Sequence, residues 1–298
     1  MSSTHSIGGR ALLARLAAAA AASIALAGPV AAEPRGAPAT PAAPLVIGET
    51  FTIDSRVLRE KRRINVYTPP RPGGGDGPLP VLYMPDGGVG EDFLHVAGLV
   101  QVSVGNGTMR PFLLVGIENT SRRRDMTGPT RVAEDRKIAP RVGGAPAYRA
   151  FLRKELMPAI RARYRTTGET AIVGESLAGL FVMETFFVEP ALFDIYIAID
   201  PSLWWNGEAL VRRAAARLRG KRPRGTRTLF MASSSQAEIA LHTGQLAKVL
   251  EDGRFPRLEW QYAPMPAEQH STIYHPAALR AFRAVLAPAP RPAVKRGG

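Results

Sequence analysis

The sequence has 298 residues, no cysteine and a formal net charge of +14 at pH 7. The absence of cysteine excludes disulfide bonds, thiolate metal sites and thiol nucleophiles. Only six of the 39 basic residues are lysine, and the arginines lack the interleaved aromatic side chains of a base-stacking surface. We therefore expect no nucleic-acid partner, whereas an anionic small molecule or envelope surface stays compatible with the charge.

Residues 1–32 have the organisation of a cleaved secretory signal. Arg10 and Arg15 form a positive region, residues 16–27 are apolar and uncharged, and residues 30–32 are small. The alternative is a membrane anchor, but the uncharged run is short for crossing a bilayer. We predict cleavage to a mature chain of 266 residues that is periplasmic or secreted, without stable membrane insertion.

The rest of the chain reads as one domain between two spacers. Residues 33–44 are rich in Pro and Ala and predict an extended linker, and residues 289–298 predict a flexible tail. Between them, residues 45–288 contain no internal repeat and no second linker. This length suits a single α/β domain.

Strand-like and helix-like segments alternate through this domain. The predicted strands are 51–58, 63–67, 81–84, 112–117, 170–173, 195–199, 228–232 and 258–262. The predicted helices are 93–101, 147–164, 177–187, 208–218, 241–251 and 277–286. The alternation indicates a mostly parallel sheet of about eight strands with helices on both faces, and the first two strands predict an antiparallel hairpin at one edge. Residues 118–146 show no convincing core pattern, and so long a connection is usually functional or mobile.

The stretch Gly174-Glu175-Ser176-Leu177-Ala178-Gly179 lies between a predicted strand and a predicted helix. A hydroxyl becomes a useful nucleophile when a sharp turn exposes it to a base, and small neighbours let strand and helix approach closely. The pattern departs from Gly-x-Ser-x-Gly by one methyl group, at Ala178. We predict Ser176 as the nucleophile and the Leu177 N–H as an oxyanion donor; an ordinary serine-capped turn is the alternative.

His270 is the predicted general base. It follows the strand 258–262, and a hydrolase with the order serine, acid, histidine places its histidine there. His275 is the main rival, although it precedes a proline at a helix entry. Glu238 follows the strand 228–232 and is the predicted acid. In one alternative, Glu238 only complements the dipole at the start of its helix. In the other, a Ser–His dyad works without an acid.

The second oxyanion donor is expected after an early central strand. Gly87 and Gly88 follow the strand 81–84, and glycine lets a backbone N–H approach a developing negative charge closely. A plain turn is the alternative.

Several long stretches together resemble the esterase D-like, siderophore-esterase branch of the α/β-hydrolases. They are LPVLYMPDGG, LLVGIENTSRRRDMT, the block from FLRKELMPAIRARY through GESLAGLF to PALFDIYIAIDPSLWW, and MPAEQHSTIYHPAALRAF. The resemblance implies a serine hydrolase of the α/β-hydrolase fold that acts on esters, with Ser176 as nucleophile and His270 as base. The family often has His where this chain has Glu175, and it does not always use an acid.

Four residues are candidates for binding the substrate. Trp204 and Trp205 follow the strand 195–199 and could stack on an aromatic acyl group, with core packing as the alternative. Arg122 and Arg124 begin the long connection and could pair with an anionic group such as a ferric catecholate, with surface salt bridges as the alternative.

The sequence thus predicts an exported serine hydrolase that cleaves carboxylic esters through an acyl-enzyme, with siderophore lactones as the leading substrate. It predicts neither a metal nor an organic cofactor. The alternatives are an acyltransferase on the same fold, a non-catalytic binding protein of hydrolase fold, or an adhesion protein driven by charge.

Overall fold

The computed structural model describes residues 41–71, 74–220 and 225–289. The chain divides into two units, Met1–Leu45 and Val46–Gly298. The predicted signal, most of the predicted linker and residues 290–298 lie outside the described residues. Within the described ranges, no helix is both long and apolar enough to cross a membrane.

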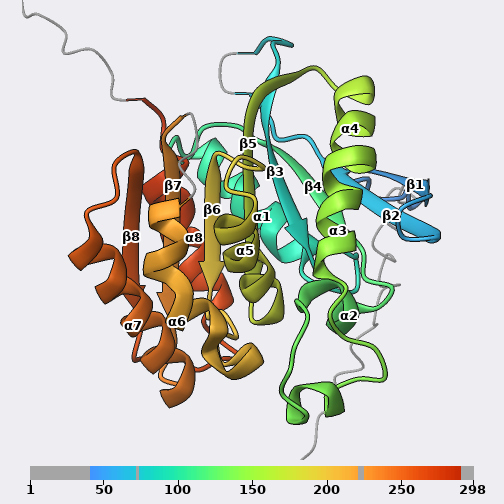
Figure 1. The fold of residues 1–298 in the computed structure, drawn as a ribbon. Helices are drawn as coiled ribbons and strands as arrows, with labels where there is room; N and C mark the ends of the chain where they lie inside the picture. Colours follow the sequence, from blue (N-terminus) through green and yellow to red (C-terminus); the bar gives the residue numbers. More distant parts are fainter. Residues whose placement is uncertain (1–40, 72–73, 221–224, 290–298) are drawn as a thin grey trace, which may run out of the picture. The chain divides into compact units, whose positions relative to one another are not determined.

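The second unit is built on one eight-stranded sheet with the order β1-β2-β4-β3-β5-β6-β7-β8 (Figure 1). Its strands are β1 Glu49–Ser55, β2 Glu60–Tyr67, β3 Leu79–Pro85, β4 Leu113–Ile117, β5 Thr166–Glu175, β6 Ile195–Ile199, β7 Arg227–Ser233 and β8 Leu258–Pro264. The first two strands form the predicted antiparallel hairpin, and β2 is also antiparallel to β4. All other neighbours are parallel.

Helices cover both faces of the sheet, as predicted. They are α1 Phe93–Gly105, α2 Arg122–Met126, α3 Ala145–Phe151, α4 Met157–Arg163, α5 Leu177–Val188, α6 Trp205–Gly220, α7 Ala237–Gly253 and α8 Tyr274–Val285. The core divides accordingly: α1 and α8 pack on one face, and α3 to α7 pack on the other (Figure 1). This arrangement is the α/β-hydrolase fold.

Alternation along the central strands explains the two cores. In β3, the side chains of Val81 and Tyr83 belong to one core and those of Leu82 and Met84 to the other. Successive side chains of a strand point to opposite faces, so a strand covered on both sides is apolar throughout. All seven residues of β3 are buried.

The structure differs from the sequence prediction in two segments. The single helix predicted over residues 147–164 contains a π-helical turn, Leu152–Leu156, between α3 and α4. Pro158 is the second residue of α4 and has no N–H to donate to the preceding turn, which a wider turn accommodates. The connection 118–146 contains α2 and a 3₁₀ turn, Glu134–Lys137, so it is partly helical despite its weak core pattern.

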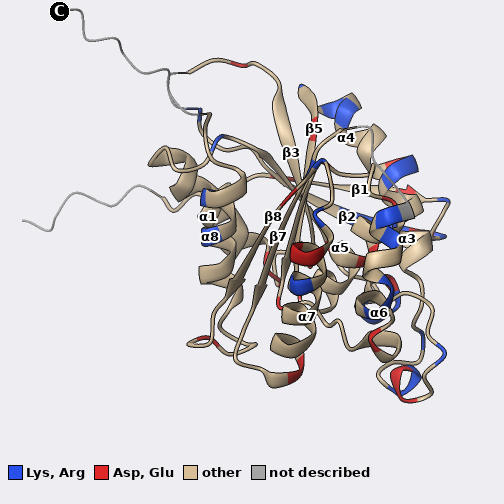
Figure 2. Cartoon of the chain, turned by 60° about the vertical axis from the view of Figure 1, so that its left-hand side comes forward, with Lys and Arg blue, Asp and Glu red and all other residues tan. Residues whose placement is uncertain are grey.

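Charged residues are distributed over many elements. Figure 2 shows Lys and Arg on helices at several positions around the sheet, with Asp and Glu among them. Many of these charges are paired, for example in the salt bridges Arg110–Glu169 at 2.5 Å and Arg149–Glu184 at 3.0 Å. The distribution agrees with a solvated basic surface more than with one continuous nucleic-acid track.

Candidate active site

Ser176 stands on the sharp turn between β5 and α5. Its backbone has φ 59° and ψ −118°, a conformation that residues with a side chain rarely adopt. The Ser176 N–H donates to the Ile199 carbonyl at 3.0 Å, and the Ser176 carbonyl accepts from Leu180 at 2.9 Å. These bonds hold the turn open toward the carboxyl edge of the sheet. The predicted strand-turn-helix elbow is present, with Ser176 at its centre.

Small residues allow this turn to close. A Cβ atom added to Gly174 would lie 2.8 Å from the Cβ of Ala178, and one added to Gly179 would lie 2.8 Å from the Ile199 carbonyl oxygen. Both distances are too short for real side chains. The methyl group of Ala178 therefore fits because Gly174 leaves room for it, and Gly179 lets the start of α5 approach the end of β6. The departure from the usual motif leaves the elbow intact.

His270 reaches Ser176 from the loop after β8. The loop is tied to the end of β7 because Met265 donates its N–H to the Ser233 carbonyl at 2.8 Å. His270 Nε2 then lies 3.0 Å from Ser176 Oγ, across 94 residues of sequence. His275, the rival candidate, is exposed and stacks on His95 at 5.0 Å between ring centroids.

Asp200 bonds to the other nitrogen of His270, which corrects the prediction for Glu238. Asp200 directly follows β6, and its Oδ2 lies 2.5 Å from His270 Nδ1. Its side chain is fully buried and accepts from the Ser234 N–H at 2.6 Å and the Ser234 hydroxyl at 2.8 Å. Glu238 is exposed in the first turn of α7. The prediction of Glu238 as the partner of His270 is therefore wrong, and its helix N-terminal alternative applies.

Glu175 brings a second carboxylate to the same imidazole. Its Oε1 lies 3.4 Å from His270 Nδ1. Burial raises the pKa of Glu175 to about 8, although the charges of His270 and Arg122 oppose this shift. The hydrogen bond to Asp200, reinforced by the charge of Glu175, raises the pKa of His270 above its usual 6.5 against the effect of burial.

The glycine loop after β3 uses both of its predicted donors internally. The Gly87 N–H donates to the Ile117 carbonyl at 3.0 Å, which removes Gly87 as an oxyanion donor in this conformation. The Gly88 N–H donates to Glu91 Oε2 at 2.7 Å. A carboxylate thus occupies the Gly88 amide, so this amide becomes available only when Glu91 moves away.

Arg122 braces the loop that contains these glycines. Its Nε and Nη2 atoms donate to the two carboxylate oxygens of Asp86 at 2.7 and 2.8 Å, and Nη2 lies 3.4 Å from the Glu175 carbonyl oxygen. Asp86 also accepts from the Asn119 side chain at 2.6 Å. Arg122 therefore links β3, α2 and the elbow, and much of its charge is already compensated by Asp86.

The other three candidates for substrate binding lie deeper than expected. Arg124 is bound to Glu60 and Asp125, with 16% of its side chain exposed. Trp205 is 4% exposed, and its Nε1 donates to the Gly128 carbonyl at 2.9 Å, which is the core-packing alternative. Trp204 is half-buried at 6.0 Å from Trp205. Of the two tryptophans, only Trp204 keeps partial exposure at this edge.

One cluster in the described part of the chain has the donor types of a metal site, and it consists of Glu175, Asp200 and His270 within 4.8 Å of one another. Both imidazole nitrogens of His270 are already in contacts, Nε2 with Ser176 and Nδ1 with Asp200. This geometry is that of a hydrogen-bonded Ser–His–Asp chain.

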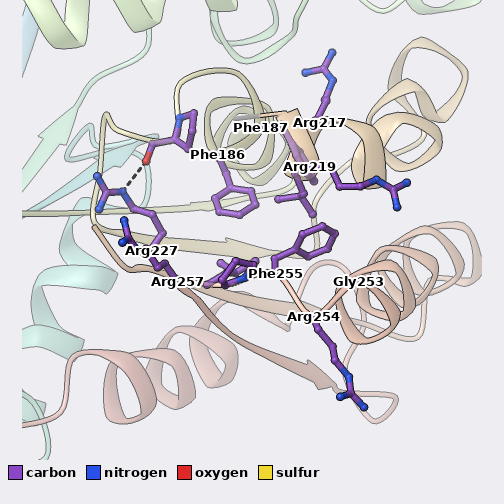
Figure 3. A pocket seen from close by; sticks show the side chains of 13 residues that line it. Phe186, Phe187, Arg217, Arg219, Arg227, Gly253, Arg254, Phe255 and Arg257 are labelled. Atoms are coloured by element: carbon purple, nitrogen blue, oxygen red, sulfur yellow. Dashed lines mark hydrogen bonds between the residues drawn. The ribbon is translucent and has the colours of Figure 1, made fainter. Parts of the chain in front are cut away.

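A cavity at the amino edge of the sheet is separate from this cluster. It measures about 200 Å³ and lies where α5, α6 and α7 end and β7 and β8 begin. Phe186 and Phe255 face its centre, whereas Arg217 and Arg254 extend outward (Figure 3). Strands of seven residues place it roughly 20 Å from the elbow. Arginines at helix C-termini are common because they offset the negative end of the helix dipole.

A family model described as "Putative esterase" matches residues 55–276. This range includes Ser176, Asp200 and His270. Two curated relatives are a siderophore triacetylfusarinine C esterase of Aspergillus fumigatus, 32% identical over 48% of this chain, and the ferri-bacillibactin esterase BesA of Bacillus subtilis, 30% identical over 55%. The matched regions span 50% and 64% of those two proteins.

Solved structures agree on the fold. An IroE-like serine hydrolase from Shewanella oneidensis superposes with a TM-score of 0.72 and 26% identity, covering 80% of each chain. The siderophore hydrolase EstB from Aspergillus nidulans superposes with a TM-score of 0.68 and 21% identity, covering 86% of this chain and all of the other. The chain therefore belongs to this esterase family and has the α/β-hydrolase fold.

Proposed function

We propose that this protein is a serine hydrolase that cleaves carboxylic esters through an acyl-enzyme. The observation that carries the proposal is the continuous chain Ser176 Oγ–His270 Nε2 at 3.0 Å and His270 Nδ1–Asp200 Oδ2 at 2.5 Å. A base in hydrogen-bond reach of a hydroxyl, itself oriented by a buried acid, is the arrangement that activates serine.

The residues divide the reaction between them. Ser176 Oγ attacks the ester carbonyl while His270 Nε2 takes its proton, and Asp200 holds the Nδ1–H and stabilises the imidazolium. His270 then gives the proton to the leaving alkoxide oxygen, so an alcohol departs and the acyl group stays on Ser176. Water, deprotonated by His270, releases the acid and restores Ser176.

Oxyanion stabilisation is assigned to backbone amides. The first donor is the Leu177 N–H. Leu177 is the first residue of α5, and the first amides of a helix have no acceptor within that helix. The Gly88 N–H is the second donor, and it requires Glu91 to release it. Losing one such donor typically costs about 3 kcal/mol of transition-state stabilisation.

Siderophore esters are the proposed substrate class. The support is the agreement of two curated relatives whose names specify siderophore substrates, triacetylfusarinine C and ferri-bacillibactin. Arg122, 35% exposed beside the elbow although paired with Asp86, offers a partly accessible guanidinium to an anionic ligand, and half-buried Trp204 supplies an aromatic face.

Export completes the proposal. Residues 1–32 are assigned as a cleaved signal, so the mature enzyme would act in the periplasm or outside the cell. Mass spectrometry of protein recovered from the periplasmic fraction and the medium tests this. A chain beginning near residue 33 supports it, and an intact Met1 in the cytoplasm contradicts it.

The central experiment is labelling by a fluorophosphonate probe. Wild type should label, Ser176→Ala should not, and Ser202→Ala, at a neighbouring serine, should label like wild type. Hydrolysis of a ferric catecholate trilactone, followed by chromatography, then tests the substrate class. Equal labelling of wild type and Ser176→Ala, or no labelling of either, overturns the serine mechanism.

A further inference from the structure

The Glu175 carboxylate has no part in the mechanism above, although it lies inside the site. Its side chain is 16% exposed, and Oε1 is buried without a hydrogen-bond partner among the described residues. Burying a carboxyl group without compensation is costly. The atom that Oε1 approaches is Nδ1 of His270, at 3.4 Å.

Two carboxylates therefore converge on one nitrogen, but they are held differently. Asp200 is fixed by two hydrogen bonds from Ser234 and lies close to Nδ1, at 2.5 Å. Glu175 Oε1 lacks such bonds and lies about 1 Å farther away. A small rotation of the imidazole or of the Glu175 side chain would bring Oε1 into hydrogen-bond range.

We propose that Glu175 is a second positioning carboxylate for His270, which shares the imidazolium with Asp200 and accepts the Nδ1–H when Asp200 cannot. This inference rests on the proposed serine hydrolase function. It explains why a carboxyl group beside the nucleophile is compatible with catalysis: its charge favours the protonated histidine that forms in the transition state.

The electrostatics of the site support this coupling. The groups that influence Glu175 are His270 after β8, Asp200 after β6, Asp86 after β3 and Arg122 on α2, and Tyr274 on α8 senses its charge. His270 and Arg122 favour the ionised carboxylate, whereas burial and the two aspartates favour the protonated form. A proton arriving on His270 therefore makes it easier for Glu175 to ionise, and the two groups titrate as a pair.

The test compares wild type, Glu175→Gln, Asp200→Asn and the double variant. Each is assayed for kcat and KM with p-nitrophenyl acetate between pH 5 and 10. In Glu175→Gln, kcat should fall by about 3- to 10-fold and the acid limb of kcat/KM should move to lower pH. The reason is that Glu175, which ionises more easily as His270 gains its proton and then raises the His270 pKa, is gone. KM should stay nearly constant.

Asp200→Asn should lose less than the roughly 10⁴-fold expected when a triad acid has no substitute. Adding Glu175→Gln to it should reduce kcat by a further 10-fold or more. The variant Asp200→Asn/Glu175→Asp should have a lower kcat than Asp200→Asn alone, because the shorter Asp side chain does not reach His270 as well as Glu175 does. The inference is overturned if the double variant equals Asp200→Asn and Glu175→Gln leaves the acid limb in place.

Two controls separate this inference from the proposed function. Glu238→Gln removes an exposed carboxylate and should leave the profile unchanged. If fluorophosphonate does not label wild type at Ser176, the proposed function itself fails. If it does label Ser176 but the acid limb of kcat/KM is the same in wild type and Glu175→Gln, only this inference fails. Should Asp200→Asn not fold, the shift in Glu175→Gln alone decides the matter.

Discussion

Left-handed backbone occurs at both edges of the sheet, but with different side chains and different surroundings. At the carboxyl edge, Asp86, Ser176 and Asp200 follow β3, β5 and β6 with φ of 57°, 59° and 46°. At the amino edge, Arg254 and Arg257 have φ of 41° and 63°. The first three are buried or half-buried, whereas both arginines are exposed.

The difference shows what strained backbone accomplishes in this molecule. Asp86 and Asp200 each accept two or more hydrogen bonds, which fixes the direction of their carboxylates. A residue stays in a disfavoured conformation when its surroundings over-determine it, and such positions gather at functional sites. At the amino edge, the same conformation merely turns the chain between α7 and β8.

The largest expected effect is the loss of activity on replacing His270. His270→Ala should lower kcat by about 10³-fold or more, because it removes the base that lies 3.0 Å from Ser176 Oγ. His275→Ala and Arg254→Ala, the latter at the amino edge, should each stay within about two-fold of wild type. Steady-state hydrolysis of p-nitrophenyl acetate measures this; an impaired Arg254→Ala would erase the contrast between the edges.

Replacing a glycine by alanine should lower the free energy of unfolding more at the carboxyl edge of the sheet than at the amino edge. A Cβ at Gly87 would lie 2.3 Å from the backbone of Gly116 and Ile117, and one at Gly253 would lie 2.2 Å from the Phe255 ring. The strand cannot yield but the ring can rotate, so Gly87→Ala should lose about 3 kcal/mol and Gly253→Ala less than about 1 kcal/mol. Urea unfolding gives both values, and equal losses would refute this reasoning.

A smaller effect concerns the pH dependence of stability. The pKa of Glu175 rises from 4.5 to about 8 on folding, so the folded state binds the extra proton and loses stability as pH increases through this window. Glu175→Gln should therefore raise the melting temperature by a few degrees at pH 9 and leave it nearly unchanged at pH 4.5. Thermal scans at both pH values check the sign; a larger gain at pH 4.5 would reverse it.

The smallest effect is expected at Glu238. This side chain is exposed on α7 and does not contact His270, so Glu238→Ala should keep kcat and KM within about two-fold of wild type. The same assay as for His270→Ala applies. A 100-fold loss would instead require a rearranged site in which Glu238 replaces Asp200.

The carboxylate that contacts His270 shows why part of the site could not be predicted from the sequence. Asp200 directly follows a predicted strand, so a search restricted to strand ends would have included it. Chain order alone permits any carboxylate between Ser176 and His270. Glu238 also follows a predicted strand, so it met the same criterion as Asp200. The order of the strands in the sheet decides between them, because β6 lies next to β5, whereas β7 lies one strand farther from Ser176.

The contacts made by the predicted binding side chains could not be predicted from the sequence for a related reason. Arg124 and Trp205 are polar or aromatic residues after strands, which fits a binding surface as well as an internal brace. Only the fold shows that Arg124 pairs with Glu60, from β2, and that Trp205 donates to Gly128. The bond from the Gly88 amide to Glu91 joins residues only three positions apart, but this spacing alone does not predict it.

The sequence by itself determined the alternating elements, the elbow at Ser176 and the histidine at the end of a late strand, because apolar periodicity and small residues act locally along the chain. The tertiary structure decided which carboxylates meet His270 and which amides and arginines are already engaged. Those contacts join residues up to about a hundred positions apart, and their distances depend on strand order and on backbone turns that no local pattern specifies.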